Sequence, residues 1–280
     1  MTEFRPFRLA GVIGWPVSHS RSPALHGFWL REHAIAGAYL PMAVRPEALP
    51  AALKGLPALG FAGCNVTIPH KVAAMALVDE VDPLARRIGA LNTVVVRADG
   101  TLLGLNTDAE GYGANLAEAQ PGWRADRGPA VVLGAGGGAR AVIASLTDRG
   151  APEIRVLNRT LARAQALADE IGPPLRALPW ERRSEALGGA ALLVNTTSQG
   201  MAGQPPLEIS LDRLSRDTLV CDIVYIPCET PLLLAARSRG NPTVDGLGML
   251  LHQAVPAFRA FFGVTPKVTS ALRQAIEATL

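Results

Sequence analysis

The 280-residue sequence contains little cysteine, little lysine and no long hydrophobic run. Its three cysteines, Cys64, Cys221 and Cys228, are odd in number and show no CxxC spacing, which argues against a disulfide framework or a zinc site. No apolar stretch approaches the roughly 18 residues of a membrane helix, and the first one, at 9–15, is short and runs at once into Pro16. We therefore expect a cytoplasmic protein whose cysteines are small buried hydrophobes.

Histidine and net charge give equally little support for metal or nucleic-acid binding. None of the five histidines forms a metal-ligand motif such as HExxH, and we predict no metal. The 27 basic residues outnumber the 24 acidic ones only slightly, and they are scattered along the chain instead of forming a dense patch. We expect a small-molecule substrate and neither nucleic acid nor membrane as a partner; the sequence leaves open whether the protein is a monomer or a homodimer.

The composition, 49% hydrophobic and 18% charged, is typical of a globular protein and excludes disorder. In the first third of the chain, short β-like runs alternate with helical patterns, which predicts an α/β domain with a mostly parallel sheet. The predicted strands are 9–14, 38–43, 64–68, 92–97 and 101–105, and the predicted helices are 22–34, 46–56 and 69–78. Asp99-Gly100 between the last two strands indicates a two-residue hairpin loop.

A second α/β unit follows a Gly- and Pro-containing connection at 120–128. Its predicted strands are 130–133, 154–157, 191–195 and 219–223, and its predicted helices are 139–149 and 161–171. Two further helices, at 247–262 and 270–278, are expected to return to the first domain. The predicted domains are therefore 1–108 plus 247–280 and 109–246, with a ligand cleft between them.

The strongest local motif is a glycine loop of the form G-x-G-x-x-A that joins the strand 130–133 to a helix. Glycines at these positions let the backbone turn tightly and approach a pyrophosphate, which the positive end of the helix dipole stabilises. A flexible turn is the alternative, but the flanking strand and helix favour dinucleotide binding. The residues assigned to the pyrophosphate are Gly134, Ala135, Gly136, Gly137, Gly138 and Ala139.

The end of the next predicted strand indicates which cofactor is bound. NAD-binding folds carry an acidic residue there, which accepts hydrogen bonds from the ribose 2′-hydroxyl. This sequence instead has Asn158, Arg159 and Thr160, with Arg163 one turn later. Arginines can bind a 2′-phosphate that a carboxylate would repel, so NADP is favoured over NAD. The alternative is that Thr160 only caps a helix and that the arginines are solvated.

Only three of the 27 basic residues are lysines, so a lysine within an apolar segment stands out. Lys71 lies in the first turn of the predicted helix 69–78, where a cation is electrostatically unfavourable and needs a special partner. Unlike arginine, lysine can exchange a proton during catalysis. Asp108 and Ser22 each have an ordinary explanation as helix N-caps, and only their occurrence together with Lys71 makes them candidates for a site.

Seven motifs of the sequence occur in the order found in shikimate dehydrogenases. They are Gly14-x-Pro16-x-x-His19-Ser20-x-Ser22-Pro23, Asn65-Val66-Thr67-x-Pro69-x-Lys71, Gly89-Ala90-x-Asn92-Thr93, Gly104-x-Asn106-Thr107-Asp108-x-x-Gly111, Gly134-Ala135-Gly136-Gly137, Asn158-Arg159-Thr160 and Asp245-Gly246-x-Gly248-Met249-Leu250-x-x-Gln253-Ala254. The sequence thus resembles an NADP-dependent shikimate dehydrogenase over nearly its whole length. The resemblance implies an N-terminal α/β substrate domain, a Rossmann-type NADP-binding domain, and reversible reduction of 3-dehydroshikimate to shikimate in aromatic amino-acid biosynthesis.

The resemblance also implies roles for single residues. Lys71 and Asp108 become the catalytic pair, because a lysine ammonium can stabilise and protonate the oxygen that gains negative charge as hydride arrives. Which of the two delivers the proton is left open. Ile223 and Gly246 correspond to residues that line the nicotinamide, although family members often have methionine at the position of Ile223. The residues implied to contact the substrate's hydroxyls and carboxylate are Ser20, Ser22, Thr67, Asn92, Tyr225 and Gln253.

Two other functions remain as alternatives. One is a quinate or quinate/shikimate dehydrogenase of the same superfamily, many of which use NAD. The other is a catalytically silent NADP-binding regulator on the same fold. Asn158-Arg159 without an acidic residue, and the pair Ser20 and Ser22, favour shikimate and NADP. The presence of both Lys71 and Asp108 favours an enzyme.

Overall fold

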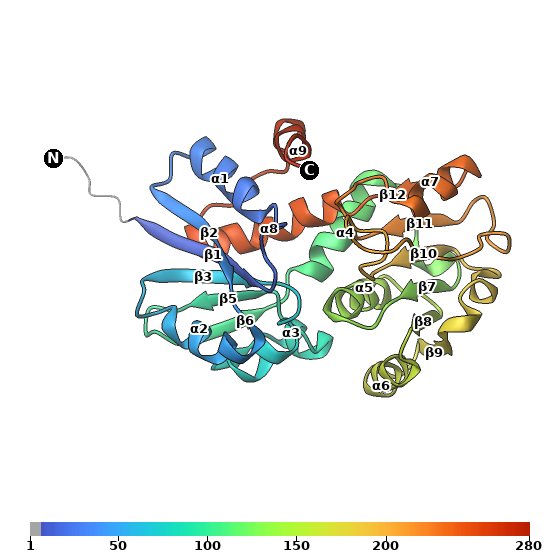
Figure 1. Cartoon of the computed structure of the whole chain (residues 1–280), viewed down its shortest axis with the longest axis horizontal. Coiled ribbons are helices and arrows are strands. Elements are labelled where there is room, and N and C mark those ends of the chain that lie inside the picture. The colour runs from blue at the N-terminus through green and yellow to red at the C-terminus, as the bar shows by residue number, and fades with distance from the viewer. Residues whose placement is uncertain (1–6) are drawn as a thin grey trace. The chain divides into compact units, whose positions relative to one another are not determined.

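The computed structural model of the protein describes residues 7–280, and the chain divides into two compact units (Figure 1). Unit 1 is Met1–Asp108 together with Leu251–Leu280, and unit 2 is Ala109–Leu250. Each unit contains one six-stranded sheet with helices packed on it. Helix α4, Asp108–Ala119, begins at the last residue before unit 2, and helix α8, Leu247–Phe262, begins in unit 2 and ends in unit 1.

Unit 1 has a mixed sheet in the order β2-β1-β3-β5-β6-β4. Its strands are β1 Arg8–Gly14, β2 Gly37–Ala43, β3 Phe61–Val66, β4 Glu80–Val81, β5 Thr93–Val96 and β6 Leu102–Leu105. Its helices, besides the end of α8, are α1 Ser22–Glu32, α2 Leu49–Gly55, α3 Pro83–Ile88 and α9 Ser270–Glu277, with short 3₁₀ turns η1 Pro46–Ala48 and η2 Ala73–Ala76. β5 is antiparallel to both β3 and β6, and the other neighbours pair in parallel.

Both faces of the unit 1 sheet are covered, which is why its central strands are apolar on both sides. Helix α2 packs on one face, where Leu49 and Leu53 belong to the same hydrophobic cluster as Ile13 and Val66. The other face carries an aromatic cluster from α1, β2 and α8, which contains His26, Trp29, Tyr39, Phe258, Phe261 and Phe262. Each fully buried side chain of this size contributes about 1.5–3 kcal/mol to folding.

Two local predictions in unit 1 were wrong. The β5–β6 loop has three residues instead of two: Arg97 N donates to Thr101 O, and Gly100 takes a φ of +84° that glycine adopts without strain. The predicted helix at 69–78 is only the four-residue 3₁₀ turn η2. The carbonyl of Lys71 accepts a hydrogen bond from Leu91 N, and Lys71 lies in the turn that precedes η2 instead of in a regular helix.

Unit 2 has a fully parallel sheet in the order β12-β11-β10-β7-β8-β9. Its strands are β7 Ala130–Leu133, β8 Ile154–Asn158, β9 Leu175–Pro179, β10 Leu192–Asn195, β11 Leu219–Asp222 and β12 Thr243–Val244. Its helices, besides α4 and the start of α8, are α5 Gly137–Asp148, α6 Leu161–Ile171 and α7 Pro231–Ser238, with 3₁₀ turns η3 Ala125–Arg127, η4 Trp180–Arg182 and η5 Glu185–Leu187. Among these strands and α-helices, β9, β12 and α7 were not predicted from the sequence.

The strand order of unit 2 confirms the predicted Rossmann-type architecture. The chain enters at β7, runs outward through β8 and β9, and then returns to the other side of β7 for β10, β11 and β12. Helices α4, α5 and α6 share one hydrophobic cluster with the sheet, and α7 belongs to another on the opposite face. In open parallel sheets, ligands bind at the carboxyl ends of the strands where the order reverses, here between β7 and β10.

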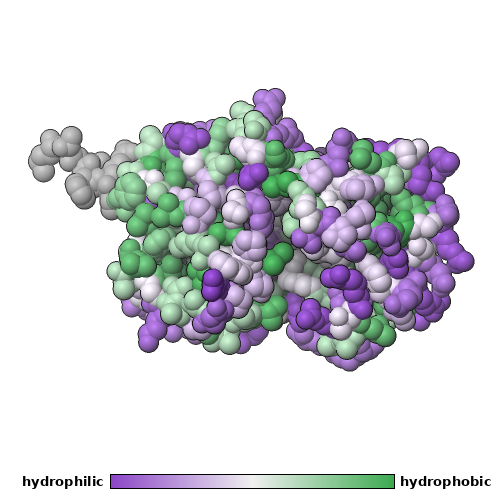
Figure 2. Space-filling model, viewed as in Figure 1, coloured by the Kyte–Doolittle hydropathy of each residue, from purple (hydrophilic) through white to green (hydrophobic). Residues whose placement is uncertain are grey.

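The surface of unit 1 exposes more large apolar side chains than that of unit 2 within residues 7–280. Figure 2 shows hydrophobic surface over the region of β1 and β2, where Phe7 and Leu40 are exposed. No helix within residues 7–280 has the length and apolar character needed to cross a membrane.

Candidate active site

Lys71 and Asp108 are in direct contact within unit 1. Lys71 Nζ donates a hydrogen bond to Asp108 Oδ2 over 2.6 Å. The Asp108 side chain is only 6% exposed and that of Lys71 is 18% exposed, so the ammonium keeps limited access to solvent. Asp108 is the first residue of α4, yet its carboxylate is engaged by other side chains instead of serving as a helix cap. The pair combines a proton donor with a fixed anionic partner, as general acid catalysis requires.

The other oxygen of Asp108 is held by a network of uncharged polar side chains. Asn92 Nδ2 donates to Asp108 Oδ1 over 2.9 Å, to Thr107 Oγ1 over 2.9 Å and to Gln253 Oε1 over 3.3 Å. Asn92 Oδ1 in turn accepts from the backbone N of Thr107 over 2.8 Å. Asn92, Thr107 and Gln253 are each at most 8% exposed. Both Asp108 oxygens therefore act as acceptors in this arrangement.

The topology explains why residues far apart in sequence meet here. The parallel strands β1, β3 and β6 have their carboxyl ends at one edge of the sheet, and the antiparallel β5 has its amino end there. Lys71 follows β3, Asp108 follows β6 and Asn92 precedes β5. The backbone links the same edge directly, since Val66 N donates to Asn92 O over 2.7 Å.

The three remaining candidates of unit 1 also follow strands that end at this edge. Ser20 and Ser22 come after β1, and Ser22 N donates to Ser20 Oγ over 3.4 Å. Ser22 is the first residue of α1 instead of its N-cap, and its side chain hydrogen-bonds with the hydroxyl of Tyr39. Thr67 comes after β3, and its methyl group packs so closely on Gly14 that a Cβ there would lie 2.6 Å from it.

Sequence reasoning assigned no role to two buried residues that support this network, Tyr39 and Asn65. Tyr39 donates from its hydroxyl to Asn65 Oδ1 over 2.7 Å, and Asn65 Nδ2 donates to Asn92 O and Thr93 Oγ1. Asn65 is the second-last residue of β3 and lies two positions before Thr67, and a polar residue near the end of an apolar strand was the available signal. Asn65 thus fixes the position of the Asn92 backbone through its carbonyl oxygen.

In unit 2 the glycine loop has the geometry that a pyrophosphate requires. Gly134 has φ +112°, and a Cβ there would lie 2.6 Å from Thr196 Oγ1, so only glycine fits without strain. A Cβ on Gly136 would meet no atom within 4 Å, which means that the loop faces open space on that side. Helix α5 begins at Gly137, so its free amide groups point toward the same region.

The predicted 2′-phosphate residues lie at the carboxyl end of β8. Arg159, Thr160 and Arg163 are exposed, and neither arginine has a carboxylate partner within residues 7–280, whereas Arg140 pairs with Glu170 over 2.6 Å. Thr160 is the N-cap position of α6 but makes no side-chain capping bond. Asn158 Nδ2 donates to Thr160 O over 3.0 Å and holds the turn. Two exposed guanidinium groups, one after β8 and one in the first turn of α6, have the charge and hydrogen-bond donors to bind a dianion.

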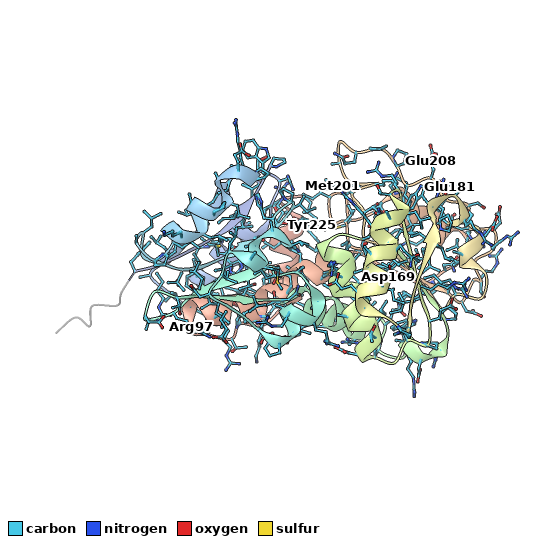
Figure 3. All side chains as sticks on the ribbon, turned by 90° about the horizontal axis from the view of Figure 1, so that it is seen from below. Arg97, Asp169, Glu181, Met201, Glu208 and Tyr225 are labelled. Atoms are coloured by element: carbon cyan, nitrogen blue, oxygen red, sulfur yellow. The ribbon has the colours of Figure 1, made fainter. Side chains whose placement is uncertain are left out.

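Ile223 and Gly246 lie against each other next to the glycine loop. A Cβ on Gly246 would lie 2.3 Å from Ile223 O, and a Cβ on Gly138 would lie 2.8 Å from Ile223 Cδ1. Tyr225 lies in the loop after β11, beside the loop that carries Met201, because Ala202 N donates to Ile226 O over 2.8 Å (Figure 3).

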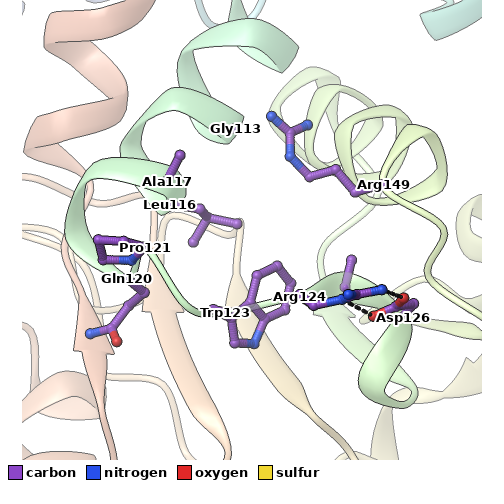
Figure 4. A pocket seen from close by; sticks show the side chains of 10 residues that line it. Gly113, Leu116, Ala117, Gln120, Pro121, Trp123, Arg124, Asp126 and Arg149 are labelled. Atoms are coloured by element: carbon purple, nitrogen blue, oxygen red, sulfur yellow. Dashed lines mark hydrogen bonds and ion pairs between the residues drawn. The ribbon is translucent and has the colours of Figure 1, made fainter.

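The cavity of about 290 Å³ in unit 2 is separate from these residues (Figure 4). It is lined by the last turns of α4 and by the segment that follows, including Trp123, and the guanidinium of Arg149 fills the space over Gly113. Its cations are engaged, since Arg124 pairs with Asp126 and Arg149 Nη1 donates to Ser145 Oγ over 2.7 Å. None of the predicted site residues lines it.

Comparisons with known proteins identify the family of the chain. Three family models match the chain: the shikimate dehydrogenase substrate binding domain at 12–94, shikimate / quinate 5-dehydrogenase at 115–223, and the shikimate 5′-dehydrogenase C-terminal domain at 246–277. Shikimate dehydrogenase (NADP(+)) of Paramagnetospirillum magneticum is 60% identical over 266 residues, which cover 95% of this chain and 96% of that protein.

Solved structures show the same likeness. Shikimate 5-dehydrogenase from Thermus thermophilus, in complex with NADP(H) and shikimate, matches with a TM-score of 0.86 and 40% identity over 98% of this chain and 100% of that one. Quinate dehydrogenase from Corynebacterium glutamicum, in complex with NAD, matches with a TM-score of 0.89 and 35% identity over the same shares. Family models that together span most of the sequence, and a relative of this identity, leave one conclusion: the chain belongs to the shikimate dehydrogenase family.

Proposed function

We propose that the protein is a shikimate dehydrogenase, an oxidoreductase that catalyses the reversible NADPH-dependent reduction of 3-dehydroshikimate to shikimate. The observation that carries this proposal is the 2.6 Å contact between Lys71 Nζ and Asp108 Oδ2 beside the buried amide of Asn92 and hydroxyl of Thr107. A polyhydroxylated acid offers many hydrogen-bonding groups, and such side chains match them. NADP, when bound, supplies or accepts the hydride.

In the proposed mechanism Lys71 delivers the proton and Asp108 positions it. Both Asp108 oxygens already accept hydrogen bonds, one from Lys71 and one from Asn92. The Lys71 ammonium has three N–H groups and uses one of them on Asp108, which leaves the others for the substrate's carbonyl oxygen. As that oxygen gains negative charge, the ammonium stabilises and then protonates it. In the reverse direction the same nitrogen takes the proton from the hydroxyl.

The other candidate residues act as binding groups in this proposal. Gln253, Asn92 and Thr107 form a continuous polar group, so Gln253 turns toward the substrate with its orientation already fixed. Ser20, Ser22, Thr67 and Tyr225 complete the substrate contacts. Unit 1 is thus proposed as the substrate domain.

Unit 2 is proposed as the NADP domain. The open side of the glycine loop fits a pyrophosphate, and Arg159 and Arg163 fit a 2′-phosphate, as their exposure and their lack of carboxylate partners among residues 7–280 support. Ile223 and Gly246 are proposed to line the nicotinamide. The three cysteines are free, which is usual in a reducing compartment, and we propose that the protein works in the cytoplasm as a monomer or homodimer.

Initial rates at the absorbance band of reduced nicotinamide, measured with shikimate or quinate against NADP or NAD, test the proposal. Rapid turnover confined to shikimate with NADP is the expected result. Lys71→Ala tests the mechanism, and Lys54→Ala, at a lysine on α2 outside the network, is the matched control. Turnover with no preference for shikimate, or none with any pair, would overturn the proposed function.

A quinate dehydrogenase is the second candidate, favoured by the structural likeness to the Corynebacterium glutamicum enzyme. Asn158 in place of an acidic residue at the end of β8 argues for NADP and thus against an NAD-dependent quinate enzyme. The same four assays distinguish the two, because a quinate dehydrogenase turns over quinate with NAD faster than shikimate with NADP.

A further inference from the structure

One carboxylate of unit 2 is buried without a cation. Asp222 is the last residue of β11 and is 1% exposed, and no lysine or arginine within residues 7–280 forms an ion pair with it. Burial raises the pKa of Asp222 to about 6, although hydrogen bonds from Val224, Asn195 and Thr230 oppose the rise. A buried charge that is compensated only by hydrogen bonds lowers the stability of the fold. The hydrogen bonds of Asp222 must therefore hold their donors in positions that an apolar side chain could not fix.

The carboxylate is fully used as an acceptor. Asp222 Oδ1 accepts from Val224 N over 3.0 Å and from Asn195 Nδ2 over 3.1 Å. Asp222 Oδ2 accepts from the same Asn195 Nδ2 over 3.1 Å and from Thr230 Oγ1 over 2.8 Å. Thr230 is also the N-cap of α7, where its hydroxyl accepts from Leu233 N. Asp222 therefore fixes both ends of the loop that joins β11 to α7.

Asn195 extends these contacts to the neighbouring loop. It is the last residue of β10 and is fully buried. Its Nδ2 also donates to Gln199 O over 3.0 Å, and its Oδ1 accepts from the backbone N and the hydroxyl of Thr197 over 3.0 and 2.7 Å. One carboxylate and one amide thus determine the paths of both loops that leave the carboxyl ends of β10 and β11.

Both loops border the glycine loop. Thr196 Oγ1 donates to Leu133 O over 2.6 Å, at the start of the glycine loop. Ile223, the residue after Asp222, packs on Gly138, and its carbonyl packs on Gly246. A shift of the Asp222 loop would therefore move the wall on which the nicotinamide is proposed to lie.

We propose that Asp222 is a positioning residue, which acts through Asn195 and Thr230 to hold the Ile223 loop at the depth that hydride transfer requires. This inference rests on the proposed function. Its physical basis is that a reacting centre misplaced by about 1 Å loses roughly 100-fold in rate, whereas binding at a distant part of the cofactor is unaffected. Asparagine cannot replace the carboxylate, because its amide group would turn a donor toward the donors of Asn195 or Val224.

The experiment compares Asp222→Asn with two variants of Thr230 and one control. Thr230→Val removes a donor to the carboxylate, and Thr230→Ser keeps it. Asn241→Ala is the matched control, because Asn241 is a buried residue of unit 2 in the connection before β12, and it donates to the carbonyls of Ser215 and Thr218 near the amino end of β11. Its loss lowers the stability of unit 2 without touching the loops at the carboxyl ends.

Four quantities are measured for each variant: the melting temperature, kcat for shikimate oxidation, and the dissociation constants of NADPH and of adenosine 2′,5′-bisphosphate by fluorescence and calorimetric titration. For Asp222→Asn we expect kcat to fall at least about 10-fold and NADPH to bind about 5-fold more weakly, with the bisphosphate affinity within about twofold of wild type, because the bisphosphate lacks the nicotinamide. Thr230→Val should change the same quantities less, Thr230→Ser should behave as wild type, and Asn241→Ala should lower only the melting temperature.

Three results would overturn the inference. They are wild-type kcat and NADPH affinity in both Asp222→Asn and Thr230→Val, an equal loss of kcat in Asn241→Ala, or an equal loss of bisphosphate affinity in Asp222→Asn. If Asp222→Asn does not fold, Thr230→Val against Thr230→Ser decides the question. Should the wild type fail to oxidise shikimate, the proposed function falls, and the difference between NADPH and bisphosphate binding still tests Asp222.

Discussion

A histidine in the aromatic cluster of unit 1 should make the protein sensitive to acid. His26 is completely buried, its ring stacks on Tyr39 with centroids 3.9 Å apart, and neither ring nitrogen has a hydrogen-bond partner within residues 7–280. A charged imidazolium there would lose its hydration without compensation, so burial lowers the pKa of His26 to about 3. The folded protein therefore keeps His26 neutral at a pH where the unfolded chain binds a proton.

The sign and size of the effect follow from this difference. Well above pH 6.5 both states hold neutral histidine and the contribution to stability is complete. As the pH falls from 6.5 toward 3, only the unfolded state gains the proton, and folding loses about 1.4 kcal/mol for each pKa unit of difference. The full loss is about 5 kcal/mol, of which about 2 kcal/mol falls between pH 7 and pH 5.

Urea unfolding of wild type and His26→Phe at pH 7 and pH 5 tests this prediction. Phenylalanine keeps the stack on Tyr39 but cannot titrate, so wild type should lose about 2 kcal/mol more than the variant over this interval. The compared quantity is the change in the free energy of unfolding between pH 7 and pH 5. A packing difference between the two rings acts equally at both pH values and cancels from this change. His19→Phe, at an exposed histidine, controls for loss of an imidazole at the surface. An identical change in the free energy of unfolding for wild type and His26→Phe would refute the reasoning.

Three further predictions concern the site. Lys71→Ala should lower kcat at least about 100-fold while the protein still folds, because it removes the proton donor; near-normal kcat would remove Lys71 from the mechanism. Replacing both Arg159 and Arg163 by glutamine should raise the KM for NADP about 10-fold or more, from the loss of charge-assisted hydrogen bonds, while the KM for NAD changes little; equal changes for both cofactors would contradict the assignment to the 2′-phosphate. Gly246→Ala should weaken NADPH binding, since its Cβ would lie 2.3 Å from Ile223 O, and a titration at the wild-type value would show that this wall of the site can move freely.

The sequence alone determined the class of fold and most of the chemistry. The alternation of apolar runs with helical patterns follows from burial on both faces of a parallel sheet, and it predicted the central strands of both units. The glycine loop, and the lack of an acidic residue at the end of β8, could be predicted from the sequence because they depend on backbone geometry and charge within a few neighbouring residues. The Lys71–Asp108 pair was found through the resemblance, because nothing local relates residues that lie in separate segments.

Only the tertiary structure decided which hydrogen-bond partners the polar groups of the site have. Lys71 was expected in a helix, but its carbonyl pairs with Leu91, a partner that no local pattern predicts. Asp222 and Asn195 are the last residues of two apolar strands, and nothing in the sequence distinguishes them from other strand ends. Only the parallel pairing of β10 with β11 brings the carboxylate and the amide together. Local propensity acts over a few residues along the chain, whereas these hydrogen bonds depend on which strands become neighbours, and that is fixed by the packing of the whole sheet.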